Sequence, residues 1–284
     1  MVMSSIRVKL LHGWPESRET MLKKFRKMTR DGNSWNDIIL CDHDPDYYVI
    51  LNYPQDEYYD PDRTLIFQME PEPLRKEWGE FYRPDKKNFL YVFDVESHRN
   101  VFDWWLSSDY KGLKKARIVK SKTLSTVTSN KTWPQLPGHT KRLQFLEYLK
   151  SKIRIDHFGF GFQELHDKET GMFPYKYTIA AENCIERNYF TEKLLDSVLA
   201  ECLCFYWGCP NVADFIDDRV FIRIDIDDYE KSTAIIQKSI QNKEWENRID
   251  AIRQEKVRVL DELSFFPTLE QVLKMPEIQQ RTGV

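Results

Sequence analysis

Short apolar runs alternate with longer amphipathic segments along most of this chain, and few folds can accommodate that pattern. In the first half, residues 16–30 show helical spacing of Met21, Phe25 and Met28. Strands that alternate with helices or long loops form parallel sheets. The first half is therefore predicted to be one open α/β layer, with strands at IRVKLLHGW (6–14), DIILCD (37–42), DYYVILNYP (46–54), TLIFQME (64–70) and FLYVFD (89–94).

The same alternation restarts after a charged stretch, residues 107–122, which contains Gly112 and is the expected connection between domains. Helices are predicted at 141–152, from about Thr191, and from Tyr229 onward. The predicted strands are LSTVTS (124–129), IRIDHFG (153–159), KYTIA (176–180), CLCFYWG (202–208) and VFIRID (220–225). Two successive α/β halves indicate two Rossmann-like domains that face one another, residues 1–115 and 116–284.

Composition excludes several classes of protein. The 284 residues include 42 Lys and Arg against 45 Asp and Glu, so the chain lacks the basic footprint of a nucleic-acid binder. Arg7 and Lys9 interrupt the apolar start, and no stretch approaches the ~20 apolar residues that span a bilayer. We expect a soluble, cytoplasmic protein without a membrane span.

The five cysteines are an odd number without CxxC spacing, which fits a reducing compartment. A zinc site at Cys202, Cys204 and Cys209 would need a fourth ligand, and the residues between them are typical of a buried strand. We therefore expect no structural metal there.

The polar stretch AENCIERNYFTEK (181–193) lies where a buried strand gives way to a helix. Thr191 is a plausible N-cap, which places Glu192 and Lys193 in the first turn with unpaired backbone amides. A helix start attracts phosphate, and Lys193 would add a full positive charge. Glu192 would repel a phosphate, so it is more suited to accept hydrogen bonds from ribose or sugar hydroxyls. An ordinary capped helix with an exposed charged face would give the same local pattern.

These residues also belong to a longer ordered pattern that resembles the donor-binding signature of the α-1,3-fucosyltransferases. The matching residues are Tyr175-Lys176-Tyr177, Ala181-Glu182-Asn183, Asn188 to Leu194, Tyr206-Trp207-Gly208, Phe215 and Phe221-Ile222, with Ser129-Asn130 and Arg142 upstream. The resemblance covers about residues 124–228 and touches the N-terminal half only faintly. It implies a GT-B enzyme with two facing Rossmann-like domains that uses GDP-fucose with inversion.

The resemblance also implies roles for individual residues. Arg142 would contact the pyrophosphate with a bidentate geometry that lysine cannot supply, and Lys193 would share that charge. Together they would stabilise the GDP leaving group, a task that a divalent metal performs in other glycosyltransferases, so we expect no cofactor. Tyr189 and Glu192 match nucleotide contacts, and Glu182 and Asn183 match the family's Glu-Asn pair.

A carboxylate base is expected as well, because the acceptor hydroxyl becomes a strong nucleophile only as its proton leaves. In the family it follows a strand of the N-terminal domain. Glu70 is the preferred match and Glu72 the second, although both would also suit a solvated turn. His98 is another candidate for the base or for an acceptor contact.

Several departures keep alternatives open. Ala181 stands where the family usually has phenylalanine, and Cys184 stands where serine or threonine is common. The chain is expected to use a glycan acceptor, but it could transfer another GDP-sugar or bind a nucleotide sugar without catalysis. Metal binding at DHDPD (42–46) or DIDD (225–228) is disfavoured, because both stretches fit turns or the family motif.

Overall fold

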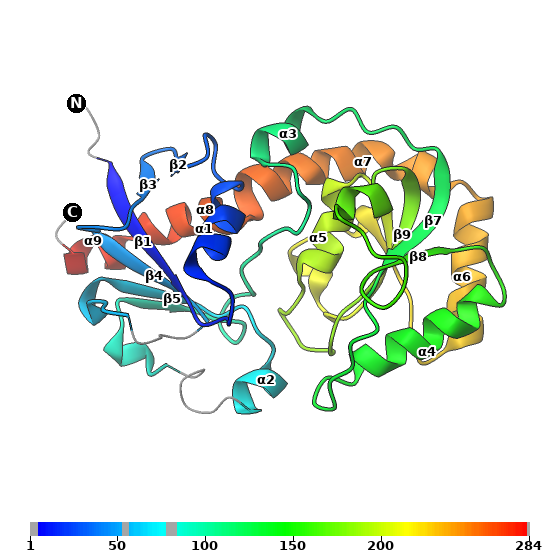
Figure 1. Cartoon of the computed structure of the whole chain (residues 1–284), viewed down its shortest axis with the longest axis horizontal. Coiled ribbons are helices and arrows are strands. Elements are labelled where there is room, and N and C mark those ends of the chain that lie inside the picture. Colours follow the sequence, from blue (N-terminus) through cyan, green and yellow to red (C-terminus); the bar gives the residue numbers. More distant parts are fainter. Residues whose placement is uncertain (1–4, 53–56, 78–83, 283–284) are drawn as a thin grey trace. The chain divides into compact units, whose positions relative to one another are not determined.

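A computed structural model describes residues 5–52, 57–77 and 84–282. The chain divides into two compact units (Figure 1). The first unit comprises Met1–Asp103, Ser108–Lys114 and Leu260–Val284, and the second comprises Trp104–Ser107 and Lys115–Val259.

The first unit is built on a sheet whose described strands follow the order β2-β3-β1-β4-β5-β6. Every neighbouring pair is parallel except β2 with β3. The strands are β1 (Ile6–His12), β2 (Ser34–Trp35), β3 (Ile38–Leu40), β4 (Tyr47–Leu51), β5 (Thr64–Phe67) and β6 (Tyr91–Phe93). The five predicted strands are confirmed, although the last two residues of the predicted 46–54 strand lie outside the described residues. Strand β2 was not predicted, because two residues are too few to show a hydrophobic period.

One helix of the first unit, α3, lies inside residues 107–122, which were expected to form only the connection between domains. Helix α1 begins where the hydroxyl of Ser17 accepts from the amide of Thr20 at 3.3 Å, and it buries Met21 and Phe25. The helices are α1 (Arg18–Arg26), α2 (Glu72–Glu77), α3 (Tyr110–Lys115), α8 (Phe265–Leu273) and α9 (Pro276–Thr282).

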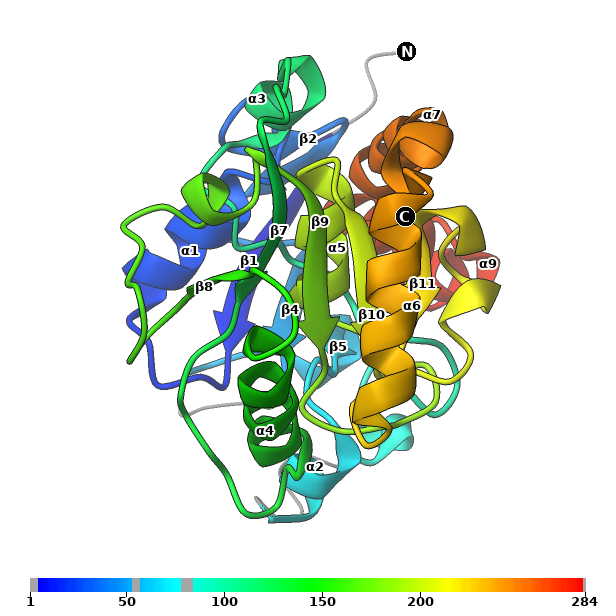
Figure 2. The ribbon, with the colours of Figure 1, turned by 90° about the vertical axis from the view of Figure 1, so that its right-hand side faces the viewer.

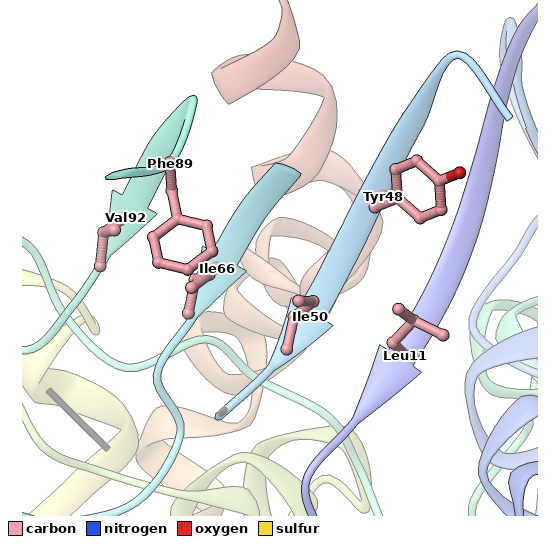
Figure 3. Packing of buried hydrophobic residues seen from close by; sticks show 6 residues of the cluster. All are labelled: Leu11, Tyr48, Ile50, Ile66, Phe89 and Val92. Atoms are coloured by element: carbon pink, nitrogen blue, oxygen red, sulfur yellow. The ribbon is translucent and has the colours of Figure 1, made fainter. Parts of the chain in front are cut away.

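Alternate residues of these strands pack on opposite faces, as the two-residue period of a strand requires. Figure 3 shows one face, from which buried side chains of β1, β4, β5 and β6 project together with Phe89. This cluster contains Leu11, Tyr48, Ile50, Ile66, Phe89 and Val92. The neighbour of Ile66, Phe67, points to the other face and meets Phe265 of α8 with ring centroids 5.7 Å apart.

The second unit has a sheet of the same kind, with all of its described strands parallel in the order β11-β10-β9-β7-β8. The strands are β7 (Lys122–Val127), β8 (Asp156–Phe158), β9 (Tyr175–Ala181), β10 (Leu203–Trp207) and β11 (Phe221–Arg223), and each overlaps a predicted strand. In both units the first parallel strand lies between the second and the third. This order creates a topological switch point at the carboxyl ends of β1 and β4, and another at those of β7 and β9.

Helices flank the second sheet on both faces. Figure 2 shows α4 and α6 in front of the strands and α5 behind them. Phe145 of α4 and Tyr229 of α6 pack with ring centroids 5.8 Å apart. The helices are α4 (Gly138–Lys150), α5 (Glu192–Leu199), α6 (Tyr229–Gln241) and α7 (Glu244–Arg258), and a π-helical turn follows (Val259–Leu263). Two mostly parallel sheets with flanking helices confirm the predicted α/β fold class.

Within the described part of the chain, no helix combines the length and the apolar character needed to cross a bilayer.

Candidate functional site

The switch point of the second unit brings the start of α4 against the segment that follows β9. The amide of Gly138 donates to the carbonyl of Asn183 at 3.0 Å. A Cβ on Gly138 would lie 2.4 Å from the carbonyl oxygen of Glu182 and 2.5 Å from that of Asn183, so the approach requires glycine. The first turn of α4 therefore sits directly on the polar segment.

Arg142, one turn into α4, is held in place by neighbours on two sides. Its Nη1 donates to Oδ1 of Asn183 at 3.2 Å, and its Nη2 lies 3.0 Å from Nδ1 of His139. The side chain is buried, and its Nε has no hydrogen-bond partner among the described residues. Burial lowers the pKa of Arg142, against the raising effect of Glu182 and Glu192. The result is a fixed, incompletely satisfied guanidinium of the kind that binds oxyanions.

His139 is a partner of Arg142 that was not predicted from the sequence. Burial, reinforced by the positive charge of Arg142, lowers the pKa of His139 to about 4. The ring is therefore neutral at pH 7 and has one nitrogen free to accept. The only indication of this contact in the sequence is spacing, because His139 lies about one helical turn before Arg142.

Glu182 is completely buried and organises the polar segment from within. Its Oε1 accepts from the amide of Thr191 at 2.9 Å and its Oε2 from the hydroxyl of Thr191 at 2.8 Å. Gly208 makes room for this side chain, since a Cβ there would lie 2.4 Å from Cγ of Glu182, and its φ of 153° also favours glycine. The structure thus gives Glu182 a local anchoring role.

Lys193 lies between two carboxylates. Its Nζ is 3.3 Å from Oε2 of Glu182 and 3.3 Å from Oε1 of Glu192. Burial by itself would lower the pKa of Lys193, but Glu192 and Glu182 raise it above its ordinary value. With Arg142 nearby, two cations face two anions, so the site is balanced in formal charge rather than strongly positive.

The predicted N-cap of the following helix is confirmed. Helix α5 starts at Glu192, and the hydroxyl of Thr191 accepts from the amide of Lys193 at 3.4 Å.

Tyr189 and Phe190 lead into that cap. Only 2% of Tyr189 is exposed, and its contact with a nucleotide stays a prediction. Phe190 stacks on Phe215 with ring centroids 5.6 Å apart. Asn188, with a φ of 62°, exchanges hydrogen bonds with Asn211. This turn holds the entry to α5 in place.

The candidate bases belong to the first unit. Glu70 follows β5, and the indole Nε1 of Trp14 donates to its Oε1 at 3.0 Å. Glu72 forms an exposed pair with Lys76 at 2.7 Å in α2. The two glutamates thus differ, since one is held by a side chain 56 residues away in sequence and the other lies on a solvated helix surface. Trp14 was not predicted, because nothing local links it to Glu70.

His98, the further candidate, packs against aromatic rings. Its Nε2 lies 2.8 Å from the hydroxyl of Tyr91, and its ring stacks on Phe93 with centroids 4.5 Å apart. Burial lowers the pKa of His98, against the raising effect of Asp94.

The two acidic stretches use their carboxylates locally. Asp42 pairs with Arg18, and Asp46 accepts from the amide of Arg7 at 2.7 Å. Asp228 caps α6, and Asp227 pairs with Lys141 at 2.6 Å. Over residues 5–52, 57–77 and 84–282 no three His, Cys, Asp or Glu side chains gather as a metal site would require, and the cysteines there are free thiols.

Comparison with known protein families finds a match within the second half of the chain. Residues 118–244 match the family model described as glycosyltransferase family 10 (fucosyltransferase) C-term. A curated relative, the putative fucosyltransferase-like protein of Arabidopsis thaliana, is 37% identical over 78 residues. That alignment covers 26% of this chain and 15% of the length of the relative.

Solved structures share the fold over nearly the whole chain. A crystal structure of an α1,3-fucosyltransferase aligns with a TM-score of 0.55 at 15% identity, covering 99% of this chain and 91% of its own. A crystal structure of α1,3-fucosyltransferase with GDP-fucose aligns with a TM-score of 0.51 at 17% identity, covering 100% and 93%. Residues 118–244 are thus similar to the C-terminal domain of glycosyltransferase family 10, and the solved structures share the fold of the chain.

Proposed function

We propose that this chain is an inverting fucosyltransferase that moves fucose from GDP-fucose to a hydroxyl of a glycan acceptor, in α-1,3 linkage. The observation that carries the proposal is the guanidinium of Arg142, which Asn183 and His139 hold at the switch point of the second sheet. Ligands of open α/β sheets bind at such points.

Arg142 and Lys193 would bind the diphosphate. Lys193 is already paired with Glu192, so an incoming phosphate would displace Glu192 from the lysine ammonium. The carboxylate of Glu192 would then accept hydrogen bonds from ribose hydroxyls. Glu182, which keeps its contacts with Thr191, would hold Lys193 in place during this exchange. Asn183 would orient Arg142, and Tyr189 would contact the nucleotide.

Charge on the leaving group would be stabilised by these side chains and not by a metal ion. As the bond between fucose and GDP breaks, negative charge grows on the β-phosphate, and a fixed guanidinium and ammonium stabilise that charge without reorganisation. We expect binding and transfer to persist in the presence of a chelator.

Glu70 is the proposed general base. As the acceptor oxygen attacks the anomeric carbon, Glu70 would take the hydroxyl proton while GDP departs from the opposite side, which inverts the configuration. The indole of Trp14 donates to one carboxylate oxygen of Glu70 and so helps to orient the carboxylate. The exposed pair of Glu72 with Lys76 makes Glu72 the weaker candidate.

Calorimetry with GDP in EDTA buffer tests the donor site. We expect binding, with UDP at least tenfold weaker, and an Arg142→Lys variant should lose at least tenfold in affinity because a lysine cannot form the bidentate contact. Absence of heat with GDP would refute the donor assignment. Competition with other GDP-sugars would show whether fucose is the sugar recognised.

A transfer assay with GDP-fucose and galactose- or N-acetylglucosamine-containing acceptors tests the catalytic proposal. Glu70→Gln should lower transfer by roughly 10²–10⁴-fold while GDP affinity is unchanged, and Glu72→Gln is the matched control that should retain activity. If the wild type neither transfers fucose nor hydrolyses the donor, the chain binds nucleotide sugars without catalysis.

A further inference from the structure

The Nδ1 atom of His139 faces two groups that it cannot satisfy together. It lies 3.0 Å from Nη2 of Arg142, which only donates, and 3.1 Å from the carbonyl oxygen of Lys131, which only accepts. A neutral imidazole either accepts at Nδ1 or donates there. One of the two contacts is therefore unsatisfied in either tautomer.

We propose that His139 exchanges partners when the donor diphosphate binds, and that it thereby acts as a positioning residue for Arg142. Without ligand, Nδ1 carries a lone pair, accepts from Nη2 of Arg142 and holds the guanidinium in place. When a phosphate takes over Nη2, Nδ1 becomes protonated and donates to the carbonyl of Lys131. This inference rests on the proposed GDP-sugar donor.

Two observations on Arg142 support the exchange. Its Nε is buried without a partner among the described residues, so the guanidinium still has donor capacity that an oxyanion would satisfy. Its Nη1 remains bonded to Asn183, which can keep the side chain in place while Nη2 changes partner. The ligand therefore has to replace only one protein contact.

The charges around His139 favour a neutral ring in the protein without ligand. Burial and the charges of Arg142, Lys193 and Lys131 disfavour a second ring proton, and the Lys131 carbonyl opposes them only in part. The proposed exchange is a tautomerisation in which Nε2 loses a proton to solvent and Nδ1 gains one. No net proton is taken up from solution.

The Lys131 carbonyl belongs to the loop between β7 and α4. In that loop the amide of Asn130 donates to the carbonyl of Phe160 at 2.9 Å, which ties it to the segment after β8. A hydrogen bond from His139 would add a tie to α4. Donor binding at Arg142 would in this way also stabilise the loop that borders the site.

Nitrogen NMR of the imidazole rings tests the exchange directly in the wild-type protein. With ¹⁵N-histidine, the His139 signals are assigned by their loss in His139→Gln. We expect an unprotonated Nδ1 in the free protein and a protonated Nδ1 with saturating GDP. An unchanged tautomer in a protein that binds GDP would overturn the inference alone, whereas failure to bind GDP would overturn the proposed function as well.

Calorimetry and matched variants provide the second test. At pH 7 the GDP binding enthalpy should be the same in buffers of different ionisation enthalpy, and uptake of a proton would contradict a tautomerisation. His139→Leu, which can neither accept nor donate, should weaken GDP binding about tenfold, whereas His139→Gln should bind more tightly than the leucine variant because a rotated amide can do either. His166→Leu, at an exposed histidine of the same unit, should bind GDP as the wild type does.

Discussion

Asp196 and Lys168 form an ion pair in the second unit, with Nζ 2.6 Å from Oδ2 of a carboxylate that has no exposed surface. The backbone amide of Trp105 also donates to both carboxylate oxygens, at 3.0 and 3.3 Å. A buried carboxylate that loses its paired cation destabilises the fold, because nothing replaces its hydration.

Lys168→Met should therefore lower the free energy of unfolding by roughly 3–5 kcal/mol. Asp196→Asn in the same background should restore part of the loss, because it removes the unpaired charge. Urea titration of the two single variants and the double variant measures the coupling. Lys238→Met, at an exposed lysine of α6, should change stability by less than about 0.5 kcal/mol; an equal effect of the two lysine variants would contradict the assignment.

Gly138→Ala should destabilise the second unit. The added methyl would lie 2.4 Å from a backbone carbonyl oxygen, and a backbone cannot yield as a side chain can. We expect a loss of about 1–3 kcal/mol in urea unfolding, together with weaker GDP binding because Arg142 would shift with α4. Gly112→Ala in α3 is the control, since its Cβ would meet the flexible side chain of Asp109 at 3.1 Å. If Gly138→Ala is as stable as this control, the close approach does not constrain the site.

The pH dependence of stability should contain a contribution from His139. Its pKa is about 4 in the folded chain against an ordinary value of 6.5, so between these values the unfolded chain binds the proton more readily. The stabilisation is complete above pH 6.5 and is lost as the pH falls through 4. Because the ring is only half-buried, we expect about 1 kcal/mol. The measurement is the difference between the unfolding curves of wild type and His139→Gln across this window. His43→Gln, at an exposed histidine, should leave the curve unchanged.

Trp14→Phe should impair transfer more than donor binding. The phenyl ring keeps most of the packing but cannot donate to Oε1 of Glu70, so the carboxylate loses the contact that orients this oxygen. We expect kcat for transfer to fall about tenfold, the effect of one hydrogen bond to a charged group, with GDP affinity unchanged. Tyr58→Phe, at a side chain that is 77% exposed, is the control. Unaltered transfer by Trp14→Phe would show that Glu70 does not depend on the indole.

Much of the fold was predictable because it is encoded in neighbouring residues. The apolar runs marked all ten parallel strands of the two described sheets, and the Thr191 cap could be read from the three residues around it. Strand β2 and helix α3 were not predicted, since a two-residue strand and a short charged helix give no hydrophobic period.

The candidate site was predictable only in its parts. Arg142, Asn183 and Lys193 were named from an ordered motif, but nothing local revealed that Glu182 and Glu192 balance the lysine charge or that His139 faces Arg142. The hydrogen bond from Trp14 to Glu70 joins the segments that follow β1 and β5. These two strands lie on either side of β4 in the sheet and are far apart in sequence. Periodicity and capping depend on residues a few positions apart, so sequence reveals them. Burial, charge pairing and the assignment of Leu260–Val284 to the first unit depend on how distant segments pack, and only the folded chain decides them.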